Sequence, residues 1–273
     1  KFLQQFSNYG VGLIIGILMA RMLSPEDYGL TAIPAVFFAI SGLFISGGFG
    51  VALVRKPELS EKDLSTAFYY SLCVGIVCYI VLYLLAPYIA EFYDAPLLTD
   101  LMRVTAINFL YSPLGTPQSV ILQRQLDFKT PAKISVVCQI FSGIVGIYLA
   151  YTGYGVWALA ISGLASGILN IVILLVSVRW LPKTGWSNES FKYLWGFGNK
   201  MVGSWLIGTI YENIAPLIIG KFFSPAQLGV YNRALGYASI PSKNITNTIQ
   251  AVSFPVLSKR QDDDSLLSNG YRK

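Results

Sequence analysis

Eight long apolar stretches occupy most of this chain of 273 residues. Each runs for about 18 to 30 residues, which at about 1.5 Å per residue is enough for a helix to cross a hydrocarbon core of about 30 Å. The stretches are residues 2–23, 28–54, 64–90, 101–122, 134–151, 156–180, 194–223 and 229–257. Because a lipid core leaves backbone groups no partner except one another, we expect an all-α membrane protein, a multi-spanning helical bundle.

Lysine and arginine fall mainly into every second gap between these stretches. They are Arg55, Lys56 and Lys62; Arg124, Lys129 and Lys133; Arg179, Lys183 and Lys192; and Lys259, Arg260, Arg272 and Lys273. Short basic loops stay in the cytoplasm, so the sequence predicts that these segments and the N-terminus are cytoplasmic. The net charge of +6 then faces anionic headgroups, and we expect membrane lipids rather than nucleic acid as partners.

Composition excludes several classes of protein. Hydrophobic residues make up 54% of the chain and charged residues 12%, whereas roughly a quarter of a soluble domain is charged. The chain has no histidine, which removes His-dependent catalysis and His ligation. Its three cysteines lie inside apolar stretches without metal-ligand spacing, and we expect them to be packing residues. It has no Gly-x-x-x-x-Gly-Lys loop for ATP.

The chain repeats a short motif at an offset of 200 residues. Residues 21–30 read Arg-Met-Leu-Ser-Pro-Glu-Asp-Tyr-Gly-Leu, and residues 221–230 read Lys-Phe-Phe-Ser-Pro-Ala-Gln-Leu-Gly-Val. In each copy the serine can cap the next helix, the proline suits its first turn, and a glycine follows four residues later. A common helix cap that arose twice would explain the Ser-Pro pair alone.

Six apolar stretches separate the two copies, and this even number predicts parallel repeats related by an axis along the membrane normal. We therefore expect one six-helix lobe over residues 1–181, a cytoplasmic linker over 182–193, the first two helices of a second lobe over 194–257, and a cytoplasmic tail over 258–273. On this interpretation the chain is a fragment of a longer transporter.

Both copies of the motif, together with the cytoplasmic run Leu122-Gln-Arg-Gln-Leu-Asp-Phe-Lys129, resemble the polysaccharide-biosynthesis exporters. These are the Wzx-type O-antigen and colanic-acid flippases of the multidrug/oligosaccharidyl-lipid/polysaccharide superfamily. The resemblance implies two six-helix lobes around a central cavity in the bacterial inner membrane. It also implies movement of polyprenyl-diphosphate-linked oligosaccharide from the inner to the outer leaflet by alternating access. The oligosaccharide would serve the synthesis of a surface polysaccharide such as lipopolysaccharide. A polysaccharide polymerase and export machinery would be the partners.

Polar side chains inside the apolar stretches recur at helical spacing, and two interpretations fit them. Small and polar residues allow close helix packing, or the polar face lines a hydrophilic cavity. Cations within a span suit a diphosphate, although Lys200 and Arg233 are also close enough to a membrane surface to extend to it. The candidate contacts to the diphosphate and the sugars are Lys200, Arg233, Lys243, Asn244, Asn108 and Tyr237.

Glu212 is the only carboxylate deep within a stretch. It is a candidate site for a coupling proton or Na⁺, with Asn213 beside it as a neutral oxygen ligand. The alternative is an ion pair with Lys200 or Lys243. We expect no other cofactor and no metal site.

Aromatic residues gather at the ends of the stretches, where an interfacial belt is expected. They are Trp157, Trp180, Trp186, Trp195, Tyr151, Tyr154 and Tyr193. Tyr111, Tyr211 and Tyr237 lie within stretches and are better candidates for stacking on sugars, although ordinary packing is the favoured interpretation of them.

Three other functions compete with a flippase. A drug or small-cation antiporter of the same superfamily would favour an acidic, aromatic pocket, which the excess of intramembrane bases argues against. A membrane-embedded transferase or polymerase would need a catalytic cluster, and the external acids Glu91, Asp94 and Asp100 are too irregularly spaced for one. We therefore expect a protein that is not an enzyme. The third alternative is a purely structural subunit.

Overall fold

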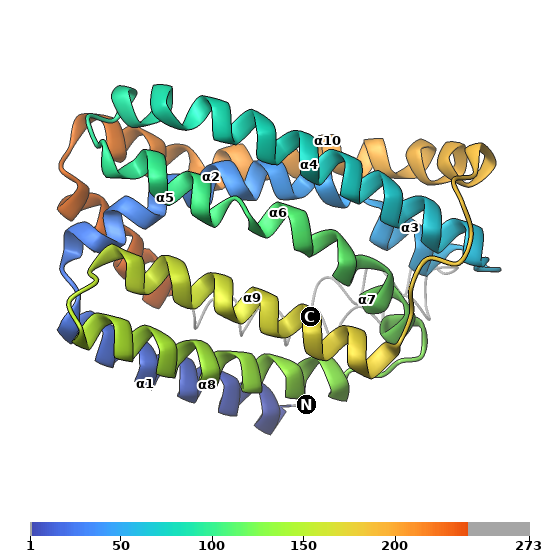
Figure 1. Ribbon diagram of the computed structural model, residues 1–273, viewed down its shortest axis with the longest axis horizontal. Helices are drawn as coiled ribbons and strands as arrows, with labels where there is room; N and C mark the ends of the chain where they lie inside the picture. Colours follow the sequence, from blue (N-terminus) through green and yellow to red (C-terminus); the bar gives the residue numbers. More distant parts are fainter. Residues whose placement is uncertain (1, 240–273) are drawn as a thin grey trace, which may run out of the picture. The chain divides into compact units, whose positions relative to one another are not determined.

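The computed structural model describes the chain from residue 2 to residue 239, with side chains from residue 10 onward (Figure 1). The helices are α1 Phe2–Met22, α2 Pro25–Ser46, α3 Phe49–Arg55, α4 Glu61–Phe92, α5 Leu97–Thr105, α6 Asn108–Tyr111, the 3₁₀ helix η1 Ser112–Leu114, α7 Gly115–Arg124, α8 Lys129–Tyr151, α9 Val156–Val178 and α10 Asn188–Phe222. Residues 225–239 are also helical. One compact unit ends at Gly229, and residues 230–239 belong to a second unit.

The predicted all-α, multi-spanning membrane architecture is confirmed. Five described segments are long and apolar enough to cross a membrane: Pro25–Arg55, Glu61–Phe92, Lys129–Tyr151, Val156–Val178 and Asn188–Phe222. Large apolar side chains on their outer faces are exposed, for example Leu84 at 61%, Ile144 at 64% and Ile207 at 74%. Such faces are stable where lipid, rather than water, is the surrounding solvent.

Two of the predicted spans are not single helices. The stretch 28–54 divides into α2 and α3 at Gly47 and Gly48, whose φ angles of 55° and 68° end one helix and start the next. The stretch 101–122 divides into α5, α6, η1 and α7. Pro113 lies in the 3₁₀ turn, and Pro117 lies in the first turn of α7, where a proline needs no bend.

Small residues allow close contacts between neighbouring helices. Helix α8 packs against both α1 and α9, and Gly146 lies at a close contact with each, where an added Cβ would lie 3.1 Å from Met19 and 3.2 Å from Ser162. Helix α10 packs against α2, α3 and α4. In the first unit, α1 and α8 run along one edge and α4 and α10 along the opposite edge. The broken fourth span, α5 to α7, and helix α9 lie between them (Figure 1).

The motif at residues 122–129 has a structural role. The guanidinium of Arg124 donates hydrogen bonds to the carbonyl oxygens of Leu53 at 3.1 Å, Val54 at 3.4 Å, Pro57 at 3.0 Å, and Lys56. These carbonyls belong to the end of α3 and the loop after it, where the helix supplies no donors of its own.

The next residues of the motif start helix α8. The Asp127 carboxylate accepts hydrogen bonds from the backbone N–H groups of Lys129 at 3.0 Å and Thr130 at 3.1 Å. These bonds, together with one from the Thr130 hydroxyl, hold the pKa of Asp127 below its usual range. The carboxylate therefore stays ionised at neutral pH and favours the start of the helix.

The predicted interfacial position is wrong for Trp180. This residue is only 6% exposed, and its ring packs edge-on against Phe68 at a centroid distance of 6.5 Å. Its indole Nε1 donates to Glu61 Oε2 at 2.9 Å, and its carbonyl accepts from Gln118 Nε2 at 3.1 Å. Its position at the end of a stretch predicted an interfacial ring. The Glu61 acceptor and the apolar cluster that includes Phe68 instead hold the ring inside the protein.

Candidate functional site

The break in the fourth span lies beside a polar surface. Helix α5 ends at Thr105 and α6 begins at Asn108, because Ala106 and Ile107 form a turn. The Thr105 hydroxyl bonds back to the Leu101 carbonyl, which satisfies it within its own helix. The break places two faces of polar residues, from α6 and α7, opposite α9.

Two adjoining pockets, which we call the polar cavity, lie at this break, with volumes of about 410 Å³ and 630 Å³. Both pockets are lined by Asn108, Tyr111, Gly163 and Gly167. The polar residues that line one or both are Thr31, Thr105, Asn108, Tyr111, Ser112, Thr116, Ser119, Gln123, Ser166 and Asn170. Among the residues that line either pocket in the described part of the chain, none is charged.

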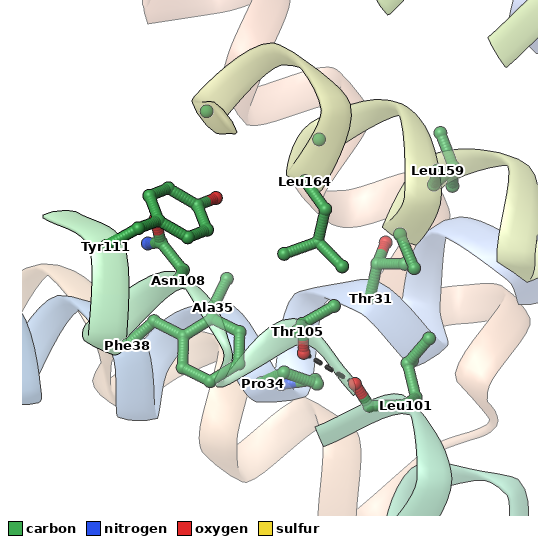
Figure 2. A pocket seen from close by; sticks show the side chains of 13 residues that line it. Thr31, Pro34, Ala35, Phe38, Leu101, Thr105, Asn108, Tyr111, Leu159 and Leu164 are labelled. Carbon is green, nitrogen blue, oxygen red and sulfur yellow. Dashed lines mark hydrogen bonds between the residues drawn. The ribbon is translucent and has the colours of Figure 1, made fainter. Parts of the chain in front are cut away.

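Figure 2 shows the first pocket, with Asn108 and Tyr111 close together at one end. The Tyr111 hydroxyl points into the space, while Thr31 of α2 and Leu164 of α9 lie across it. Gly167 makes room for the tyrosine ring, because a Cβ there would overlap its hydroxyl and lie 3.0 Å from its ring carbons. A larger residue at Gly167 would therefore displace the ring.

The chemistry of this lining suits a neutral polyol. Amides and hydroxyls both donate and accept hydrogen bonds, as sugar hydroxyls do, and the face of a tyrosine ring is a flat apolar surface for the C–H face of a sugar. No lining residue supplies a charge for a diphosphate or for a cationic drug within the described residues. A pocket of this kind fixes its ligand by several neutral hydrogen bonds rather than by one ion pair.

Of the predicted substrate contacts, the structure places only Asn108 in the polar cavity. Lys200 is exposed on α10 and lines neither pocket. Arg233 and Tyr237 belong to the second unit and contact each other, with the guanidinium 5.6 Å from the ring centre. Lys243 and Asn244 lie outside the described residues.

The proposed coupling residues lie on α10. Glu212 is exposed, and the Asn213 amide donates to the Thr209 carbonyl at 2.8 Å. An ion pair between Glu212 and Lys200 is wrong, because twelve residues of continuous helix separate them, or about 18 Å at the rise of an α-helix. The other suggested partner, Lys243, is not described.

Sequence reasoning missed the contribution of α9 to this site. Gly163, Ser166, Gly167 and Asn170 line the second pocket from that helix. Their spacings of three and four residues place them on one helical face, which is a signal that the sequence already contained. Because α9 is otherwise strongly apolar, small residues there fitted helix packing equally well.

Comparison with known proteins places this bundle in a family. The fold and the uncharged cavity define a multi-pass helical membrane protein with an internal polar surface. The family model described as "Polysaccharide biosynthesis protein" matches residues 18–273, and the chain belongs to that family. The resemblance that the sequence motifs indicated is thereby confirmed.

Three relatives illustrate the range of the family. The chain is 29% identical over 262 residues to the teichuronic acid biosynthesis protein TuaB of Bacillus subtilis, an alignment that covers 93% of this chain and 53% of TuaB. It is 22% identical to the succinoglycan biosynthesis transport protein ExoT of Rhizobium meliloti, covering 96% of the chain and 53% of ExoT. It is also 22% identical to the lipopolysaccharide biosynthesis protein WzxC of Escherichia coli, covering 97% and 54%. The chain thus spans about half the length of these relatives.

Proposed function

We propose that this chain belongs to a transporter that moves a lipid-linked oligosaccharide across the bacterial inner membrane during surface polysaccharide synthesis. The observation that carries the proposal is the polar cavity, a neutral surface of amides and hydroxyls inside a membrane-spanning bundle. A polar surface in the membrane is costly unless it contacts water or a polar ligand. Relatives named for polysaccharide biosynthesis and transport support the same assignment.

The sugar and the diphosphate would contact different parts of the protein. The polar cavity would take sugar units, because its lining offers hydrogen bonds without charge. The diphosphate would contact a cation outside the cavity, and the candidates are Lys200, Arg233 and Lys243. Alternating access would then expose the bound sugars first to one side of the membrane and then to the other. We expect no chemical change in the substrate.

The coupling role of Glu212 belongs to the same proposal. An exposed carboxylate on a membrane-spanning helix, with an amide at the next position, can bind a proton or Na⁺ when the rest of the transporter covers it. The chain has no nucleotide-binding loop of the P-loop kind, which favours an ion gradient as the energy source.

The test removes neutral hydrogen bonds from the polar cavity. Asn108→Ala with Gln123→Ala should lower export of surface polysaccharide while membrane abundance stays at the wild-type level, because each lost bond weakens sugar binding by about 0.5–1.5 kcal/mol, or about two- to tenfold. Export would be measured in cells that express the complete reading frame.

The matched control is Gln125→Ala. Gln125 is exposed two residues after Gln123 and does not line either pocket. Its replacement should leave export unchanged. Wild-type export by the Asn108/Gln123 double variant, at wild-type abundance, would contradict the assignment of the cavity to the sugar.

A further inference from the structure

The two copies of the Ser-Pro-x-x-x-Gly motif lie against each other in the first unit. A Cβ added at Gly29 would overlap the carbonyl oxygen of Pro225 and lie 3.1 Å from its Cα. A Cβ added at Gly229 would overlap the carbonyl oxygen of Pro25 and lie 2.9 Å from the backbone nitrogen of Gly29. Each glycine therefore faces the proline carbonyl of the other copy. We call this reciprocal contact the glycine seam.

The local geometry of the two copies is the same. In the first, the backbone N–H of Ser24 donates to Asp27 Oδ2 at 2.9 Å, and the Ser24 hydroxyl accepts from Asp27 N at 3.2 Å. In the second, Ser224 N donates to Gln227 Oε1 at 3.1 Å, and its hydroxyl accepts from Gln227 N at 3.3 Å. Matching caps hold both glycines at the same place in their helices, so the seam is self-complementary, like the contact across a two-fold axis.

Apolar side chains flank the seam. Leu228 is fully buried in the same cluster as Leu30 and Ile33. A Cβ at Gly220 would meet Leu228 at 3.3 Å and Ile33 at 3.4 Å. A chance repeat of a helix cap explains neither the mutual contact of the two copies nor this packing. Close backbone approach through small residues is typical of tightly packed contacts between membrane helices.

The seam lies at the start of α2. The Arg124 contacts at residues 53–57 lie at the other end of the same span, where α3 ends. By the distribution of basic residues, it is on the external side of the membrane. We propose that the glycine seam is the external gate of the transporter, closed in this structure and separated when the polar cavity opens to the outside. This inference rests on the proposed function, since a gate is needed only if access alternates.

The experiment measures access to the polar cavity from outside intact cells. The three cysteines are replaced by alanine, a single cysteine is placed at Ser166 in the cavity, and its labelling by a membrane-impermeant maleimide is timed. Gly29→Val and Gly229→Val should each raise the labelling rate. If the open state is populated at about 10% or less and becomes the major state, the rise is about fivefold or more.

The matched controls are Gly42→Val on α2 and Gly203→Val on α10. An added Cβ meets nothing within 4 Å at either position, so labelling should stay at the wild-type rate. If both seam variants reach wild-type abundance and their labelling is unchanged, the gate assignment is overturned. Labelling does not depend on the transported molecule, so this result is independent of the export of the Asn108 variant.

A cross-link decides the question if the valine variants fail to accumulate. Cysteines at Ile33 and Gly220, which pack beside the seam, would be close enough for a disulfide, because a Cβ at residue 220 lies 3.4 Å from Cγ1 of Ile33 and its three nearest neighbours are side-chain atoms. Oxidation should form the bond and stop export, and reduction should restore it. Failure of the disulfide to form, or full export by the linked protein, would overturn the proposal.

Discussion

Arg124 shows how much one side chain contributes to this fold. Its guanidinium binds carbonyl groups that lie 67 to 71 residues earlier in the chain, at the end of α3. A planar group with five donors can satisfy several carbonyls at once, whereas an ammonium group is a single point of charge. The run at residues 122–129, which was one of the motifs that indicated the family, therefore has a role in capping the end of α3.

We predict that Arg124→Lys and Arg124→Ala both destabilise the protein. Hydrogen bonds that involve a charged group contribute about 1.5 to 3 kcal/mol, and the lysine variant can restore only part of this. Thermal unfolding of the purified protein in detergent measures the change. Lys133→Ala is the control, since Lys133 is exposed and belongs to the same basic loop region. Equal stability of Arg124→Lys and the wild type would contradict the capping role.

At the level of single residues, the sequence predicted helix caps better than it predicted the site. Ser24 and Ser224 form the expected caps because such caps depend on neighbours within one turn. Asn108 lines a polar cavity, but that cavity also depends on α9, about sixty residues further along the chain. Helical spacing alone does not show which neighbouring helix a polar face meets.

At the scale of helices, the broken fourth span and α10 differ most from what their sequences suggest. The break at Ala106 and Ile107 has no proline or glycine to mark it, so it depends on packing against α4 and α9. On α10, the buried residues include Leu194, Gly198 and Gly220, while Lys200 and Glu212 are exposed. These two charged residues thus lie where α2, α3 and α4 do not cover α10.

We predict that Glu212→Gln stops gradient-driven export but leaves substrate binding near the wild-type level. The glutamine keeps the shape of the side chain and loses only the titratable charge. Export into vesicles with an imposed proton or Na⁺ gradient is the measurement, with Glu189→Gln on the same helix as the control, because Glu189 lies in its first turn. Gradient-driven export by Glu212→Gln at the wild-type rate would eliminate coupling through this carboxylate.

At the scale of the whole molecule, alternating basic loops predict the orientation, whereas the described helices establish only that the chain spans the membrane repeatedly. The expected division into two lobes at residues 181–194 stays a prediction. The glycine seam bears on it, because two copies of one motif that meet face to face are what parallel repeats would produce.

The orientation makes its own prediction. In a background without native cysteines, a cysteine at Thr152 should react with an impermeant maleimide from outside intact cells, and a cysteine at Glu58 should react only after permeabilisation. Both residues are exposed in loops or at helix ends, on opposite ends of the bundle. Reversed labelling would invert the topology and move the glycine seam to the cytoplasmic side.

The distance in sequence between Arg124 and its partners has a consequence for biosynthesis. A ribosome delivers the end of α3 to the translocon well before Arg124 has been made, so these carbonyls must first be hydrated at the membrane surface. They acquire protein donors only when the fourth apolar stretch has entered the bilayer. We therefore expect a ribosome-bound chain stalled before residue 124 to remain sensitive to protease in the loop around Pro57, and a chain stalled some forty residues later to be protected there.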